Sequence, residues 1–113
     1  ETKLTLEQMD FFSVPENRQL ILEREGRCCF YCLASLTSNN YVIEHVVSRP
    51  QGDHSYRNVV AACRQCNNRK KSESAEDFLR TLYRGGLVSS GDATNRLSQL
   101  GRLLAGELKP VVQ

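Results

Sequence analysis

Cysteine spacing gives the clearest chemical signal in this sequence of 113 residues. Two cysteine pairs each have two residues between their members, and thirty residues separate the pairs. The four cysteines are Cys29, Cys32, Cys63 and Cys66. Two such turns can direct four thiolates at one point, which is the closed tetrahedral coordination of a structural zinc ion. The fifth cysteine, Cys28, does not keep this spacing, so we predict that it is a spectator.

A second group of polar residues lies inside and directly after the spacer between the pairs. Glu44 is followed by His45, Asn58 comes after a loop, and Asn67 is next to the last cysteine. A histidine can take a proton near neutral pH, while carboxylate and amide oxygens suit a divalent cation. Taken singly, His45 could be an ordinary strand histidine, Glu44 a surface carboxylate and Asn67 a helix cap.

In order and spacing, these residues resemble the HNH endonuclease family. Between the cysteine pairs the resemblance includes the run Glu44–Arg49, Gly52 and the run Asn58–Val60. After the second pair it includes Asn67 and Lys70. It covers about residues 27–72, close to 40% of the chain.

The resemblance implies a ββα-metal finger, in which a hairpin packs on a short helix with one divalent ion, Mg²⁺ or Mn²⁺, between them. It assigns His45 as the general base that activates water. It makes Glu44 and Asn67 the ligands of the catalytic ion, with Asn67 acting through its amide oxygen. Asn58 would brace the loop and orient the base.

The sequence departs from the family pattern at three places. Glu44 replaces a common aspartate, Asn67 replaces the final histidine, and Gly52 is followed by Asp53 where two glycines are usual. Successive side chains of a strand point to opposite faces. Glu44 and His45 can therefore meet one phosphate only where the backbone bends or at the strand end.

Basic residues are concentrated in the middle of the chain. The net charge is +2, but residues 27–71 hold seven basic and two acidic side chains. Such a cluster is typical of phosphate binding, and a solvated surface is the ordinary alternative. The expected DNA contacts are Arg49, Arg64, Arg69, Lys70 and Lys71. His54 has no counterpart in the family pattern, and we expect it to be solvated.

The remaining elements follow from local patterns. Ser13–Glu16 predicts a helix start, and this helix would end near Glu25. We expect a strand pair or a hairpin at 41–43 and 46–47 and a short basic helix at 64–71. Apolar residues at helical period predict two further helices, one from Ser74 to Gly85 and one at about 92–105. We predict an α+β fold with one domain, made of segment 1–26, core 27–72 and helical extension 73–113.

The favoured hypothesis is a metal-dependent DNA endonuclease. A zinc-stabilised module that binds nucleic acid without cutting it is the alternative, and a protein-interaction module on the C-terminal helices is a third. No apolar run in the sequence is long enough to span a bilayer. We expect a cytoplasmic, reducing location, because no secretory signal is visible and the cysteine count is odd. The oligomeric state stays open.

Overall fold

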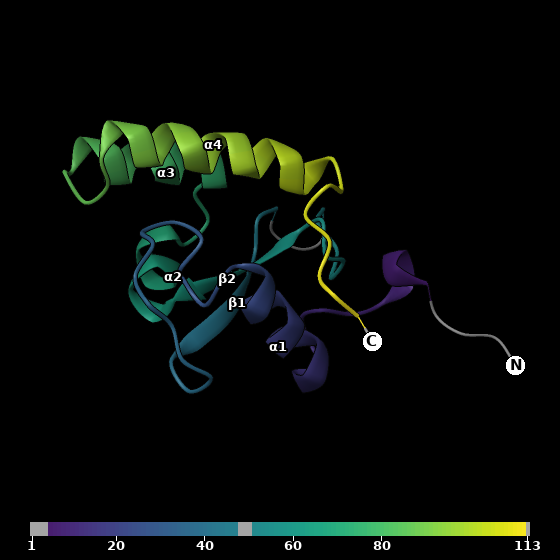
Figure 1. The fold of residues 1–113 in the computed structure, drawn as a ribbon. Helices are drawn as coiled ribbons and strands as arrows, with labels where there is room; N and C mark the ends of the chain where they lie inside the picture. Colours follow the sequence, from purple (N-terminus) through teal and green to yellow (C-terminus); the bar gives the residue numbers. More distant parts are fainter. Residues whose placement is uncertain (1–4, 48–50, 113) are drawn as a thin grey trace, which may run out of the picture.

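The computed structural model describes residues 5–47 and 51–112. Within these ranges one two-stranded antiparallel sheet is accompanied by four α-helices and a short 3-10 helix. The elements are η1 (Leu6–Gln8), α1 (Pro15–Arg24), β1 (Tyr41–His45), β2 (Val59–Cys63), α2 (Arg64–Lys70), α3 (Ala75–Arg84) and α4 (Ser90–Leu104). Helices α1 and α2 pack on the strands, while α3 and α4 pack on each other along one side (Figure 1). The predicted α+β fold is confirmed.

The sheet pairs β1 with β2 so that His45 lies opposite Val59. Every residue of β2 is buried, which fits its run of small and β-branched side chains. The second strand predicted at Val46-Val47 is wrong, because these residues lie beyond the end of β1 and the partner strand begins at Val59. The apolar run of β2 has no alternation, so its pattern does not distinguish a buried strand from a buried helix.

Helix α1 begins at Pro15, whose fixed φ suits the first turn of a helix. The helix is confirmed, but the predicted Ser13 cap is not, because the capping position is Val14 and no side chain caps it. The Asp10 carboxylate instead accepts hydrogen bonds from the backbone N–H groups of Phe12 and Ser13, each at 2.8 Å. This turn fixes the path of the chain into α1.

Arg24, the last residue of α1, ties three parts of the chain together. Its Nη1 donates to the carbonyl oxygens of Tyr56 at 2.9 Å and Leu108 at 3.1 Å. Its Nη2 donates to the Val59 carbonyl oxygen at 2.8 Å and to the Glu25 carboxylate at 2.9 Å. Because the Arg24 side chain is only 5% exposed, these charge-assisted bonds are shielded from water. They hold the start of β2 and the C-terminal segment against α1.

Serine caps start both C-terminal helices. The Ser74 hydroxyl accepts from the Asp77 N–H at 3.1 Å, and the Ser89 hydroxyl accepts from the Asp92 N–H at 3.0 Å. Both helices are confirmed, and α4 starts two residues earlier than predicted. Most of the apolar residues predicted to face the core are buried, but Tyr83 and Leu104 are 49% and 47% exposed. The buried residues of the two helices are Ala75, Phe78, Leu79, Leu82, Ala93, Leu100 and Leu103.

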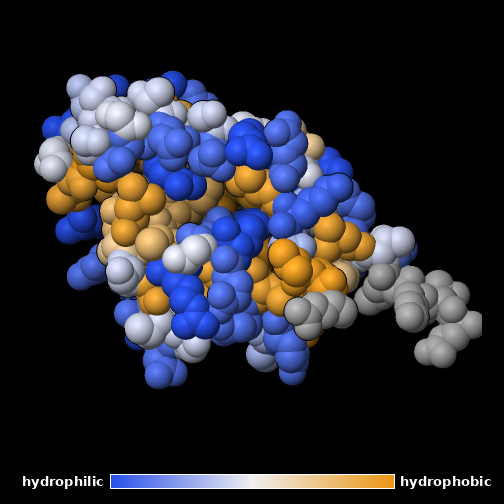
Figure 2. Space-filling model, viewed as in Figure 1, coloured by the Kyte–Doolittle hydropathy of each residue, from blue (hydrophilic) through white to orange (hydrophobic). Residues whose placement is uncertain are grey.

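The visible face of the molecule in Figure 2 is mostly hydrophilic. Hydrophobic side chains gather in a band between the α3–α4 layer and the part that contains the sheet (Figure 2). Among the described residues, no helix has both the length and the apolar character needed to cross a membrane.

Packing of α4 on the core gives a stability prediction. Leu103→Ala removes a fully buried side chain, so the free energy of unfolding should fall by about 2–5 kcal/mol. Leu104→Ala is the matched control, because the Leu104 side chain is 47% exposed and its loss leaves no cavity. Urea unfolding followed by circular dichroism measures both. Equal midpoints for the two variants would contradict the packing of α4 described above.

Candidate functional site

Four cysteine sulfurs form a compact cluster. The Sγ atoms of Cys29, Cys32, Cys63 and Cys66 all lie within 4.8 Å of one another. The Cys32 and Cys63 sulfurs are 3.7 Å apart. A tetrahedral zinc ion with Zn–S bonds of about 2.3 Å requires neighbouring sulfurs about 3.8 Å apart. The cluster therefore has the size and donor chemistry to hold a metal ion such as zinc.

Two turns present the sulfurs. In the first, Leu33 adopts a left-handed conformation at φ +67°, and its N–H donates to the Cys29 carbonyl oxygen at 3.1 Å. In the second, Cys63 ends β2 and Cys66 lies in the first turn of α2. The Cys66 N–H points at the Cys63 sulfur, 3.4 Å away. Backbone N–H groups directed at sulfur favour the thiolate form that binds metal.

The pKa values of three of the cysteine thiols are shifted in different directions. The hydrogen bond with Cys66 lowers the pKa of Cys29 to about 5. Burial raises the pKa of Cys32 to about 11, and the Cys29 charge adds to this effect. The hydrogen bond with Cys29, followed by burial, raises the pKa of Cys66. Four thiolates can share this space only when a cation compensates their charge, which is the role of a bound metal.

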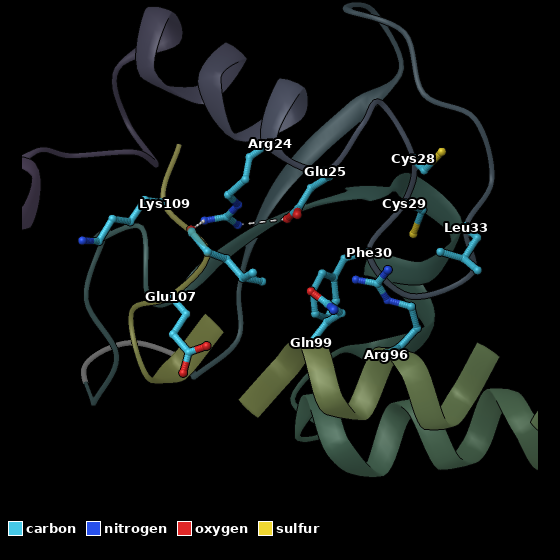
Figure 3. Close-up of a pocket in the computed structure, with 11 residues that line it drawn as sticks. Arg24, Glu25, Cys28, Cys29, Phe30, Leu33, Arg96, Gln99, Glu107 and Lys109 are labelled. Atoms are coloured by element: carbon cyan, nitrogen blue, oxygen red, sulfur yellow. Dashed lines mark hydrogen bonds and ion pairs between the residues drawn. The ribbon is translucent and has the colours of Figure 1, made fainter. Parts of the chain in front are cut away.

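Cys28 lies outside the cluster, as predicted, and forms an isolated β-bridge with Ser35. It borders a cavity of about 290 Å³ between the end of α1, the first cysteine turn and α4 (Figure 3). In this cavity the Arg96 guanidinium lies 4.5 Å from the centre of the Phe30 ring. Three basic and two acidic side chains line the cavity. None of the described lining residues is a predicted catalytic residue. The cavity is therefore separate from the candidate catalytic site.

Glu44 is a buried residue with strong partners. Its Oε1 lies 2.7 Å from the Lys70 ammonium, and its Oε2 accepts a hydrogen bond from the Tyr31 hydroxyl at 2.6 Å. The side chains of Glu44 and Lys70 are only 8% and 1% exposed. Burial raises the pKa of Glu44, and the hydrogen bonds from Lys70 and Tyr31 oppose that rise. The carboxylate therefore faces the side of the sheet that carries the cysteine turns and α2.

The basic residues fall into three groups. Arg64, Arg69 and Lys71 are exposed on or beside α2 and can reach a phosphate. Lys70 departs from the expected phosphate contact, because its buried ammonium binds Glu44 inside the protein. The expected contact Arg49 lies outside the described residues.

Asn58 holds the loop that follows β1. Its Oδ1 accepts from the Val47 N–H at 2.8 Å, and its Nδ2 donates to the carbonyl oxygens of Val47 at 2.9 Å and Asp53 at 2.8 Å. Gly52 lies against this clamp, since a Cβ there would be 1.9 Å from the Val47 carbonyl oxygen. Asn58 thus joins Val47, two residues after His45, to Asp53.

His45 lies at the end of β1 and meets a residue that the sequence analysis did not select. Its Nε2 is 2.8 Å from Nδ1 of His54. The Phe12 ring stacks on both imidazoles, with centroid distances of 4.1 Å to His45 and 5.1 Å to His54. His54 is half-buried, not solvated as expected. The sequence does show a second histidine in the loop after His45, but it does not show that the His54 side chain points toward His45.

The residues expected to hold a catalytic ion fit that role only in part. Asn67 is half-buried, and it precedes Lys70 by three residues on α2, so the two share a helix face. Its amide oxygen and the Glu44 carboxylate are hard donors of the kind that Mg²⁺ prefers. However, both oxygens of Glu44 already have partners, one of them a cation. As arranged, Glu44 does not fit a second cation, which would have to displace the Lys70 ammonium.

The geometry has a counterpart among known proteins. The model of a family described as HNH endonuclease matches residues 29–83, which hold the cysteine cluster, His45 and Asn58. This segment belongs to the HNH endonuclease family. The match confirms the resemblance found in the sequence and extends into α3. No curated protein matches the chain.

A solved structure has a fold similar to that of this chain. The Type II-C Cas9 enzyme from Actinomyces naeslundii superimposes with a TM-score of 0.59 and 22% sequence identity. The match covers 80% of this chain and 10% of the Cas9 chain, so this chain spans a small part of that protein's length. At this identity the likeness concerns the fold alone.

The cysteine cluster predicts which thiols are needed for metal. Cys66→Ser should lose bound zinc and lower the unfolding temperature, because three thiolates and a hydroxyl close the site poorly. Cys28→Ser is the matched control and should keep zinc, because Cys28 is outside the cluster. Elemental analysis of purified protein measures both. Zinc retention should also fall as the pH is lowered, because protons compete for the thiolates. Equal zinc loss in the two variants would contradict the assignment.

The buried ion pair gives a second prediction. Lys70→Met leaves the Glu44 carboxylate buried without its cation, so the free energy of unfolding should fall by about 3–5 kcal/mol. Lys71→Met is the control, because the neighbouring Lys71 is exposed and its loss should change little. Adding Glu44→Gln to Lys70→Met should recover part of the loss, since the uncompensated charge is then absent. Denaturant unfolding of zinc-loaded protein measures this, and equal midpoints for the two lysine variants would refute it.

Proposed function

We propose that this chain is a metal-dependent endonuclease that hydrolyses DNA phosphodiester bonds at one active site. The observation that supports this most directly is the position of His45 inside the matched segment. His45 ends β1, and the loop that follows it is clamped by Asn58. A base held in this way can accept the proton of a water molecule that attacks phosphorus.

Cleavage also needs positive charge near the phosphate oxygens. Negative charge grows on the attacking and leaving oxygens, and a divalent ion, Mg²⁺ or Mn²⁺, would stabilise it. Asn67 is the candidate ligand for this ion, because its side chain is only half-buried. Glu44 would join it only after separation from Lys70. The exposed Arg64, Arg69 and Lys71 would hold the DNA backbone through contacts that do not read sequence.

A second function has support from the same surface. An exposed basic helix next to a cysteine cluster would also serve a zinc-stabilised module that binds nucleic acid without cutting it. The two functions differ in whether His45 takes part in chemistry.

Nicking of a supercoiled plasmid separates them. With Mg²⁺ or Mn²⁺ added to zinc-loaded protein, the unmodified chain should convert the plasmid to the open circle. His45→Ala should lower the rate by about 10²- to 10⁴-fold, the usual contribution of a general base. Gln51→Ala, at an exposed position in the same loop, should leave the rate unchanged. Equal zinc content in all three proteins excludes misfolding as the cause.

The opposing results are distinct. If the unmodified chain binds DNA in a salt-dependent manner and cuts it with neither metal, the non-catalytic module is the function. If His45→Ala cuts as fast as the unmodified chain, His45 is not the base.

A further inference from the structure

His45 and His54 come together from different parts of the chain. His45 ends β1, and His54 lies nine residues later in the loop before β2. The 2.8 Å between Nε2 of His45 and Nδ1 of His54 is a hydrogen-bond distance. Two neutral imidazoles make this bond only when one nitrogen donates its proton and the other accepts it. The pair therefore constrains where each ring carries its proton.

A separate segment of the chain holds the pair in place. The Phe12 ring lies within 24° of parallel to His45 and within 11° of parallel to His54. The Phe11 N–H donates to the His54 carbonyl oxygen at 2.9 Å, so the same segment also holds the His54 backbone. Asp10 fixes the turn through the Phe12 N–H. Both the loop backbone and the two ring planes are thus defined by residues 10–12.

The loop also restrains His54 from its other side. The carbonyl oxygen of the preceding residue, Asp53, accepts from Nδ2 of Asn58 at 2.8 Å. The Asp53 side chain accepts from the Ser55 N–H at 3.0 Å. Both sequence neighbours of His54 are therefore held by hydrogen bonds, which keeps Nδ1 of His54 within reach of His45.

We propose that His54 is a positioning residue for His45: its Nδ1 accepts the Nε2–H of His45 and selects the tautomer with a lone pair on Nδ1. A base needs such a lone pair, and the bond also fixes the ring direction. His54 accepts no proton from water and touches no reacting atom in this role. The inference builds on the proposed nuclease function, because it names the group that prepares the proposed base.

Three variants test the role of the acceptor. His54→Leu keeps a side chain of similar size and removes the acceptor. His54→Asn keeps an acceptor, because its Oδ1 branches from Cγ as Nδ1 does. Gln51→Ala is the exposed control in the same loop. In single-turnover plasmid nicking, His54→Leu should lower the rate at saturating protein by about a hundredfold, the cost of a misplaced catalytic group. The DNA concentration dependence should stay unchanged, and His54→Asn should recover most of the rate.

A measurement that does not depend on activity accompanies the assay. In protein with ¹⁵N-labelled histidine at mildly alkaline pH, a scalar coupling across the hydrogen bond should connect Nε2 of His45 with Nδ1 of His54. The coupling should disappear in His54→Leu and stay unchanged in Gln51→Ala.

Each outcome decides the inference. A rate loss in His54→Leu with recovery in His54→Asn, together with the coupling, supports it. A normal rate in His54→Leu, or equal losses in the leucine and asparagine variants at equal stability, overturns it. If the unmodified chain cuts no DNA, the nuclease proposal fails, and the coupling decides whether His45 and His54 form the hydrogen bond on which the inference depends. Absence of the coupling in the unmodified chain overturns the inference in every case.

Discussion

A carboxylate removed from water needs a compensating charge and hydrogen bonds, and Glu44 obtains both from the segments that carry the cysteines. Tyr31 lies inside the first cysteine pair, and Lys70 follows the last cysteine by four residues on α2. Glu44 itself is the residue before His45 on β1. One buried carboxylate therefore joins the first cysteine turn, α2 and the strand that ends at the candidate base. A shift of either cysteine turn would move a partner of Glu44 and, with it, the end of β1.

The cysteine cluster and the carboxylate support each other. A two-stranded sheet with a short helix has little core of its own, and such small units need a metal or other cross-link. The cluster joins the 29–32 turn to the junction of β2 and α2. The Tyr31–Glu44–Lys70 contacts then connect the same two segments a second time, through β1. With both connections present, β1, β2 and α2 are held together on the side of the sheet that carries the sulfurs, while α1 also packs on both strands.

Local signals in the sequence were sufficient for part of this arrangement. The spacing of the cysteines identified all four members of the cluster, and serine caps with apolar periodicity located α3 and α4. Alternation along a strand predicted that Glu44 and His45 point to opposite faces, and the two side chains do contact different partners. The sequence did not identify Lys70 as the partner of Glu44, because its place in a basic run predicted a contact with DNA. His54 was missed for a related reason: the direction of a loop side chain depends on the path of the loop, which Asn58 and Gly52 set from a distance.

The residues that set the geometry around His45 extend beyond the segment that defines the family. That segment begins at residue 29, yet Phe12 stacks on both histidines and Phe11 holds the backbone of His54. Arg24 binds the carbonyl oxygens of Tyr56 and Val59, which flank Asn58 on either side. The clamp on the loop is therefore fixed from α1, and the ring planes of the histidine pair are fixed from the turn before it. A family motif supplies the chemical groups, but here their orientation comes from neighbouring chain that carries no motif. The orientation of His45 in this chain therefore depends on Phe12 and Arg24, which lie outside the matched segment.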